Sequence, residues 1–196
     1  MIVMFATGLS VPTITPAHAA DGMLDNQTGR IRTGLKIFRS LLLADRDIET
    51  KTNSDEQTDI VFIYHSNGSK AKHFAHTFVR MGRLENKGQI KGSQINVHIM
   101  RRLNSIQEEK IKPAAIFLVD PLIEDRVRAI ADYGIDNQII TFSPFEGDVE
   151  NGILGGMMVT SRIHPFINMQ TVEQSEVQIK PFFLKVAKTH APDNVK

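Results

Sequence analysis

The chain has 196 residues, a length that fits one domain with a substantial core, and its 23 basic and 22 acidic residues give a formal net charge of +1. This even balance argues against a nucleic-acid-binding protein, which needs a positively charged surface to follow phosphates. Cysteine is absent, which excludes disulfide bonds and thiol redox chemistry.

Residues 1–19 are expected to be a signal peptide. A short apolar run, Met1 to Leu9, leads to Ala17-His18-Ala19, whose small first and third residues suit signal peptidase, so cleavage is expected after Ala19. No Lys or Arg precedes the apolar run, and the alternative is a buried or disordered N-terminal segment of a cytosolic protein. No later stretch reaches the ~20 continuous apolar residues that span a bilayer. The processed chain is therefore expected to be exported without stable membrane insertion.

After a flexible segment at 20–28, residues 29–190 are expected to form a single α/β domain. Between residues 29 and 43, apolar side chains spaced by three and four predict an amphipathic helix. Apolar runs then predict strands at 59–64, 94–100, 114–119 and 139–142, separated by helices at 70–84, 104–110 and 123–133. Such alternation indicates a three-layer sandwich around a mainly parallel sheet, with a Rossmann-like strand order.

The last third of the domain predicts a hairpin followed by a helix. The runs 153–159 and 164–167 read as two antiparallel strands at one edge of the sheet, and Gly155 and Gly156 predict a bulge or a close backbone approach there. Asn168 is expected to cap the next helix through its side-chain oxygen. Pro181 suits the first turn of a terminal apolar helix.

Turns at the carboxyl ends of the strands are the best candidates for a ligand or partner site. Ser66, Asn67 and Gly68 follow the first strand and open a helix, where backbone N–H groups can hold an anion. Asp120 and Glu146 follow two later strands, and open α/β sheets bind ligands outside this edge. The alternatives are structural: Ser66 or Asn67 caps the helix after it, and Asp120 caps the helix that follows Pro121. Neither a Walker loop nor a GxGxxG motif is present, so no cofactor is predicted.

Two more specific functions, a zinc site and a hydrolytic active site, are not favoured by the residues. His65, His73 and His76 lie close in sequence and offer three zinc ligands, but His73 and His76 also fit the polar face of an amphipathic helix, and surface histidines are the favoured interpretation. No GxSxG motif is present and the acidic residues are scattered. We therefore expect no metal site, no catalytic residues and no enzymatic activity.

The order of these features resembles the YfiR-like family of bacterial periplasmic proteins. The most diagnostic segment is 155–168, with its glycine pair, hairpin and Asn cap. The opening Gly34-Leu35-Lys36-Ile37, the strand 60–64 with its Ser/Asn/Gly turn, and the apolar run 115–119 fall in the family's order. The resemblance covers residues 30–188. Some relatives carry cysteines, and since this chain has none, a disulfide switch is not carried over.

The resemblance implies a periplasmic repressor that binds the sensor domain of an inner-membrane diguanylate cyclase and couples an envelope condition to cyclic di-GMP. Contact requires exposed apolar residues, and the Phe-rich C-terminal segment predicts them: Phe182 and Leu184 cannot share one face with Phe183 and Val186. That surface would serve the cyclase or a homodimer. Two other functions stay open, a solute-binding or accessory subunit of a transport system and a hydrolase with an unrecognised site.

Overall fold

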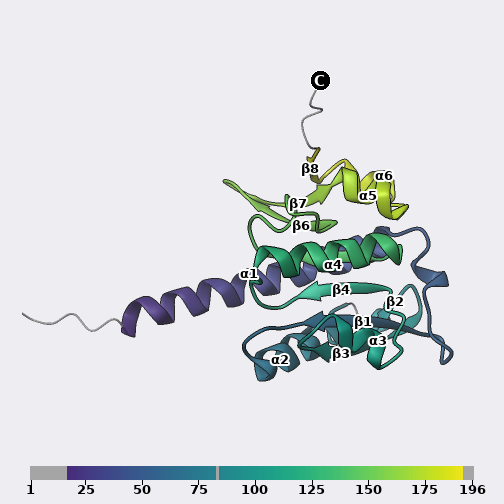
Figure 1. Cartoon of the computed structure of the whole chain (residues 1–196), viewed down its shortest axis with the longest axis horizontal. Coiled ribbons are helices and arrows are strands. Elements are labelled where there is room, and N and C mark those ends of the chain that lie inside the picture. Colours follow the sequence, from purple (N-terminus) through teal and green to yellow (C-terminus); the bar gives the residue numbers. More distant parts are fainter. Residues whose placement is uncertain (1–16, 83, 192–196) are drawn as a thin grey trace, which may run out of the picture.

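The structure is a computed structural model that describes residues 17–82 and 84–191, and its centre is one eight-stranded sheet (Figure 1). The strand order is β2-β3-β1-β4-β5-β6-β7-β8. Pairing is parallel from β3 through β6 and again between β7 and β8, and antiparallel between β2 and β3 and between β6 and β7. The strands are β1 (Gln57–Ile63), β2 (Gln89–Ile90), β3 (Ser93–Met100), β4 (Ala115–Leu118), β5 (Ile140–Ser143), β6 (Gly155–Val159), β7 (Ile163–Asn168) and β8 (Lys188–His190).

Helices cover both faces of this sheet, so the expected α/β sandwich with a mainly parallel sheet is confirmed (Figure 1). The helices are α1 (Ala17–Ala44), α2 (Gly68–Val79), α3 (Asn104–Glu108), α4 (Glu124–Asp136), α5 (Met169–Ser175) and α6 (Pro181–Leu184), with short 3-10 turns at Ile48–Thr50 and Leu84–Asn86. Among the described helices, none combines the length and the apolar character needed to cross a bilayer.

Two cores lie on the two faces of the sheet. On one face, α1 and α2 pack against aromatic side chains of β1, β4 and β5, with Phe38 of α1 within 5.5 Å of the rings of Phe78, Phe117 and Phe142. On the other face, α3 and α4 cover Val61, Ile63 and the neighbouring strands. From Ile60 onwards in β1, and throughout β4, the residues are apolar without alternation because helices bury both faces of these strands.

The largest difference from the sequence prediction is at the N-terminus. Helix α1 begins at Ala17, not at Gly29, and so includes the segment 20–28 that was expected to be flexible. Its first half projects beyond the sheet (Figure 1). The predicted cleavage point after Ala19 lies within this helix, and residues 1–16 lie outside the described residues. A helical pattern read only from buried positions misses such an extension, because the projecting turns have no sheet beneath them to demand apolar residues.

The C-terminal region also differs in detail. The hairpin β6–β7 is antiparallel as predicted, but β8 pairs in parallel with β7, so the hairpin does not form the edge of the sheet. The terminal helix is a single turn, α6, which Pro181 opens as expected. Asn168 caps α5, because its side-chain oxygen accepts a hydrogen bond from the Thr171 N–H at 3.1 Å.

Gly155 and Gly156 permit a close approach inside the sheet. A Cβ atom on Gly156 would lie 2.7 Å from the backbone oxygen of Ser143, and one on Gly155 would lie 2.7 Å from a methyl group of Leu41. The predicted close approach is therefore confirmed. The predicted edge position is wrong, because β6 lies between β5 and β7.

Candidate functional site

The strand that follows β1 in the parallel sheet, β3, lies on one side of β1, and the next strand, β4, lies on the other side. The crevice between the carboxyl ends of β1 and β4 is therefore the point at which the connections change direction across the sheet. Open α/β sheets bind their ligands at such a point. The turn that contains Ser66, Asn67 and Gly68 joins β1 to α2 on one side of the crevice, and Asp120 follows β4 on the other. The structure therefore brings these four predicted site residues together.

Asp120 fills the place that a bound anion would take. Its Oδ2 atom accepts hydrogen bonds from the backbone N–H groups of His65 and Ser66, each at 2.9 Å, and from the Ser66 hydroxyl at 3.2 Å. The Lys70 ammonium lies 4.0 Å from Oδ1, and Asp120 is only 4% exposed. The prediction that Asp120 caps the following helix is wrong: α4 has no side-chain cap, because this carboxylate binds the β1–α2 turn instead.

The same contacts set the charge state of Asp120. Burial raises the pKa of this carboxyl, but the hydrogen bonds from Ser66 and His65 and the positive charge of Lys70 outweigh burial, so its pKa lies below the ordinary value. Asn67 completes the turn by accepting a hydrogen bond from the Lys70 N–H at 2.9 Å, which caps α2 as predicted. The backbone N–H groups that could bind an anion at this turn therefore already donate hydrogen bonds to a carboxylate of the chain itself.

Glu146 belongs to a separate hollow, which Pro121 also lines. It is exposed and lines a hollow of about 340 Å³ together with Asn26, Gln27, Arg30, Pro121 and Phe145. The Arg30 side chain donates a hydrogen bond to the Pro144 carbonyl, which ties α1 to the segment after β5. This hollow has charges of both signs, from Arg30 and Glu146, and it lies where Pro121 follows β4 and Phe145 follows β5.

A buried acid that the sequence did not indicate lies next to the hollow. Asp148 is 7% exposed, and its Oδ2 accepts a hydrogen bond from the Ser143 hydroxyl at 2.5 Å. Burial raises the pKa of the Asp148 carboxyl above its ordinary value. The hydrogen bond from Ser143 and the positive charge of Arg30 offset only part of this rise, and the negative charge of Glu150 adds to it. Its only sequence signal is the spacing Ser143-x4-Asp148 across a turn that contains Gly147 at φ +85°.

The three histidines considered as a zinc site are separate surface residues. His65 contacts the Arg126 guanidinium through Nδ1 at 3.0 Å, and His73 and His76 are exposed on α2. Across residues 17–82 and 84–191, no group of three or more His, Cys, Asp or Glu side chains has the geometry of a metal site.

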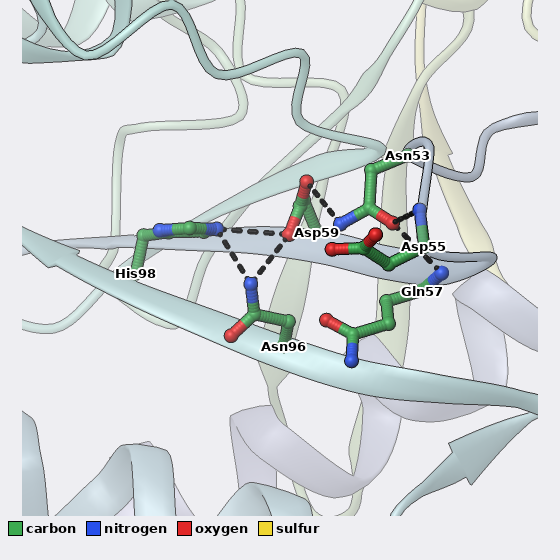
Figure 2. Close-up of polar contacts among 6 residues, drawn as sticks. All are labelled: Asn53, Asp55, Gln57, Asp59, Asn96 and His98. Carbon is green, nitrogen blue, oxygen red and sulfur yellow. Dashed lines mark hydrogen bonds and ion pairs between the residues drawn. The ribbon is translucent and has the colours of Figure 1, made fainter.

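A second polar cluster, which the sequence did not indicate, lies on the neighbouring strands β1 and β3 (Figure 2). Asp59 is 6% exposed and contacts His98 Nε2 and Asn96 Nδ2, each at 2.8 Å. The side-chain amide of Asn53 donates a hydrogen bond to the other Asp59 oxygen at 3.0 Å. The parallel register pairs Asp59 with Asn96, which places Asn96 and His98 on one face beside the carboxylate.

The C-terminal aromatic residues divide between core and surface. Phe183 is 3% exposed and belongs to the α1/α2 core, whereas Phe182 is 60% exposed and Val186 is 61% exposed. Leu184 packs partly against the core. The predicted grouping of Phe182 with Leu184 on one exposed surface is therefore wrong, because the single turn of α6 directs Leu184 inward and leaves Phe182 with Val186 outside.

Comparison with known proteins indicates the fold but no family. No family model matches the chain, and no curated protein matches it. The chain is similar to the ABC domain in complex with L-Trp from Streptococcus pneumonia, with a TM-score of 0.50 and 13% identity over 76% of this chain and 60% of that chain. A conserved domain protein from Vibrio cholerae gives a TM-score of 0.46 and 13% identity over 71% of this chain and 57% of that chain. This chain thus spans less than two thirds of either protein.

Proposed function

We propose that this protein is a periplasmic signalling regulator that acts by contact: it binds the sensor domain of an inner-membrane diguanylate cyclase and holds the cyclase inactive. The partner and the compartment follow from the resemblance to the YfiR-like family. The observation that carries the contact mechanism is the pair of exposed apolar side chains, Phe182 and Val186, at the C-terminal turn.

The core holds the backbone segment that carries Phe182 and Val186 in place. Phe183, between the two, is anchored in the core, and the backbone N–H groups of Val186 and Ala187 both donate hydrogen bonds to its carbonyl, at 3.2 and 3.1 Å. Helix α6 also contacts α1. A rigid aromatic side chain loses little conformational freedom on binding, and burying one contributes about 1.5–3 kcal/mol. Phe182 therefore has the properties of a binding anchor.

The carboxyl edge of the sheet also favours contact over capture of an anion. In α/β proteins that bind phosphates, the turn after the first strand presents its N–H groups to the ligand. Here the carboxylate of Asp120 already accepts those hydrogen bonds. A ligand at this turn would have to displace a buried and charged side chain.

A transport role is the second candidate, and the hollow beside Arg30 and Glu146 favours it. Its volume of about 340 Å³ lies at the small end of ligand pockets. One positive and one negative side chain suit the carboxylate and ammonium groups of an amino acid. The similar Streptococcus domain is described as a complex with L-Trp. Under this candidate the protein would be a solute-binding or accessory subunit.

The deciding experiment measures cyclic di-GMP in cells that carry Phe182→Asp. We expect the variant to remain folded and to raise cyclic di-GMP to the level of a gene deletion, because a charge at an exposed anchor opposes burial at the interface. Ile123→Asp is the matched control, since Ile123 is 69% exposed but precedes α4 rather than α6. This control should repress normally.

Deletion of the gene separates the two candidates. Unchanged cyclic di-GMP in the deletion strain would contradict the repressor. Calorimetric titration of the purified protein with the common amino acids would then test the transport candidate, and saturable binding that is lost in Glu146→Ala would support it.

A further inference from the structure

A smaller hollow, of about 130 Å³, adjoins the one beside Arg30 and Glu146. Arg30, Phe145 and Glu146 line both hollows and therefore lie at the boundary between them. The smaller hollow lies at the carboxyl edge of the sheet, because Phe145 follows β5, and Met158 and Val159 end the neighbouring parallel strand β6. This is the edge at which open α/β sheets bind their ligands.

Most of the side chains that line the smaller hollow are apolar. They come from the β5–β6 loop and from both strands of the β6–β7 hairpin: Phe145, Val149, Met157, Met158, Val159 and Phe166. Phe145, Met157 and Phe166 are buried and fixed, whereas Met158 is half-buried and can adapt to a ligand because its side chain is unbranched. An apolar cavity of about 150 Å³ holds one benzene molecule. The smaller hollow therefore fits one apolar side chain between leucine and phenylalanine in size.

Charged groups of opposite sign line the same hollow without neutralising one another. Arg30 donates a hydrogen bond from Nε to the Pro144 carbonyl, which orients the guanidinium, and its two terminal nitrogens donate none to the residues that the structure describes. Glu146 and Glu150 both line the hollow, and neither forms an ion pair within residues 17–82 and 84–191. The hollow thus presents one cationic and two anionic side chains beside an apolar surface.

We propose that the smaller hollow is a binding site for a free α-amino acid with an apolar side chain. The terminal nitrogens of Arg30 bind the α-carboxylate, since a guanidinium offers the paired N–H groups that suit a carboxylate. Glu146 binds the α-ammonium group, and Glu150 adds a second negative charge for it. The side chain of the ligand packs against Met158 and its apolar neighbours. The larger hollow gives the ligand a path to the boundary.

Simpler ligands match only part of this site. An apolar carboxylic acid would pair with Arg30 but would bring its negative charge close to Glu146 and Glu150. An apolar amine would leave the terminal nitrogens of Arg30 without an acceptor. A polar amino acid would lose hydrogen bonds to water when its side chain entered the apolar hollow. The proposal rests on the transport candidate, whose ligand it names, and does not depend on the repressor.

Calorimetric titration of the purified protein with L-leucine and three analogues tests the site. We expect saturable binding of L-leucine and at least about tenfold weaker binding of L-asparagine, which has nearly the same shape but a polar side chain. 4-Methylpentanoate lacks the ammonium group and 3-methylbutylamine lacks the carboxylate, and each should also bind at least about tenfold more weakly. Absence of saturable leucine binding, or equal affinities for leucine and asparagine, would overturn the proposal.

Glu146→Gln tests the assignment of the ammonium group, and the fold should tolerate it because Glu146 is exposed. We expect it to weaken leucine binding at least about tenfold without weakening the binding of 4-methylpentanoate, which has no ammonium group to lose a partner. Glu109→Gln is the matched control, because Glu109 is an exposed glutamate at the end of α3, and it should bind leucine as the unchanged protein does. Equal weakening of both ligands in Glu146→Gln would contradict the assignment.

The same titrations distinguish failure of this proposal from failure of either proposed function. If amino acids bind regardless of their side chains and lose affinity in Glu146→Gln, the transport candidate is supported and the apolar preference is overturned. Met158→Gln checks that preference directly, since it should reduce the advantage of leucine over asparagine by making the lining more polar. The repressor is tested separately, by cyclic di-GMP in the deletion strain.

Discussion

The carboxylate that closes the β1–α2 turn gives a stability prediction with a defined sign and pH range. In Asp120→Asn, the amide oxygen can occupy the Oδ2 position and keep all three hydrogen bonds, but these bonds lose the charge of their acceptor. Charged hydrogen bonds contribute about 1.5–3 kcal/mol each and neutral ones about 0.5–1.5 kcal/mol. With about 1 kcal/mol lost at each of the two short backbone contacts, we expect destabilisation by about 2 kcal/mol at pH 7.

The pH dependence follows from the lowered pKa of Asp120. A carboxyl with a lower pKa in the folded state stabilises the fold above its unfolded pKa of about 3.9, and this contribution is lost as the pH falls through the folded pKa. The difference between Asp120→Asn and the unchanged protein should therefore shrink as the pH falls from 7 towards about 2. Urea unfolding across this range measures it, with the exposed Asp132→Asn as the control. An equal difference at both ends of the range would refute the assignment of the charge.

Two further predictions concern the same edge of the sheet. Gly156→Ala should destabilise the domain by about 2–3 kcal/mol, because its Cβ would lie 2.7 Å from the Ser143 backbone oxygen. The control is Gly29→Ala, whose Cβ would meet no atom within 4 Å and should not lower the stability. Equal melting temperatures for the two variants would contradict the close approach. Asp148→Asn should stabilise the protein at pH 7, because a raised folded pKa means that stability is lost as the carboxyl ionises with rising pH; this gain should vanish below about pH 4, and thermal unfolding at both pH values measures it.

The layers of the fold are predictable from sequence because each buried strand is continuous and apolar. The segments 59–64 and 114–119 have no polar interruption after their first residue, and only a strand covered on both faces needs that pattern. The short strands β2 and β8 are not predictable in this way. They have two and three residues and form the two edges of the sheet, where burial no longer selects apolar residues.

Some of the candidate site residues are predictable from the sequence, and others are not. The Ser66–Gly68 turn and Asp120 are predictable, because the carboxyl ends of parallel strands meet at one edge. The role of Asp120 was wrongly predicted, since only the structure shows that its carboxylate faces the turn before α2 and not the helix after it. The hydrogen-bonded cluster of Asp59, Asn96 and His98 depends on the register between two strands, and no local spacing in the sequence carries that register.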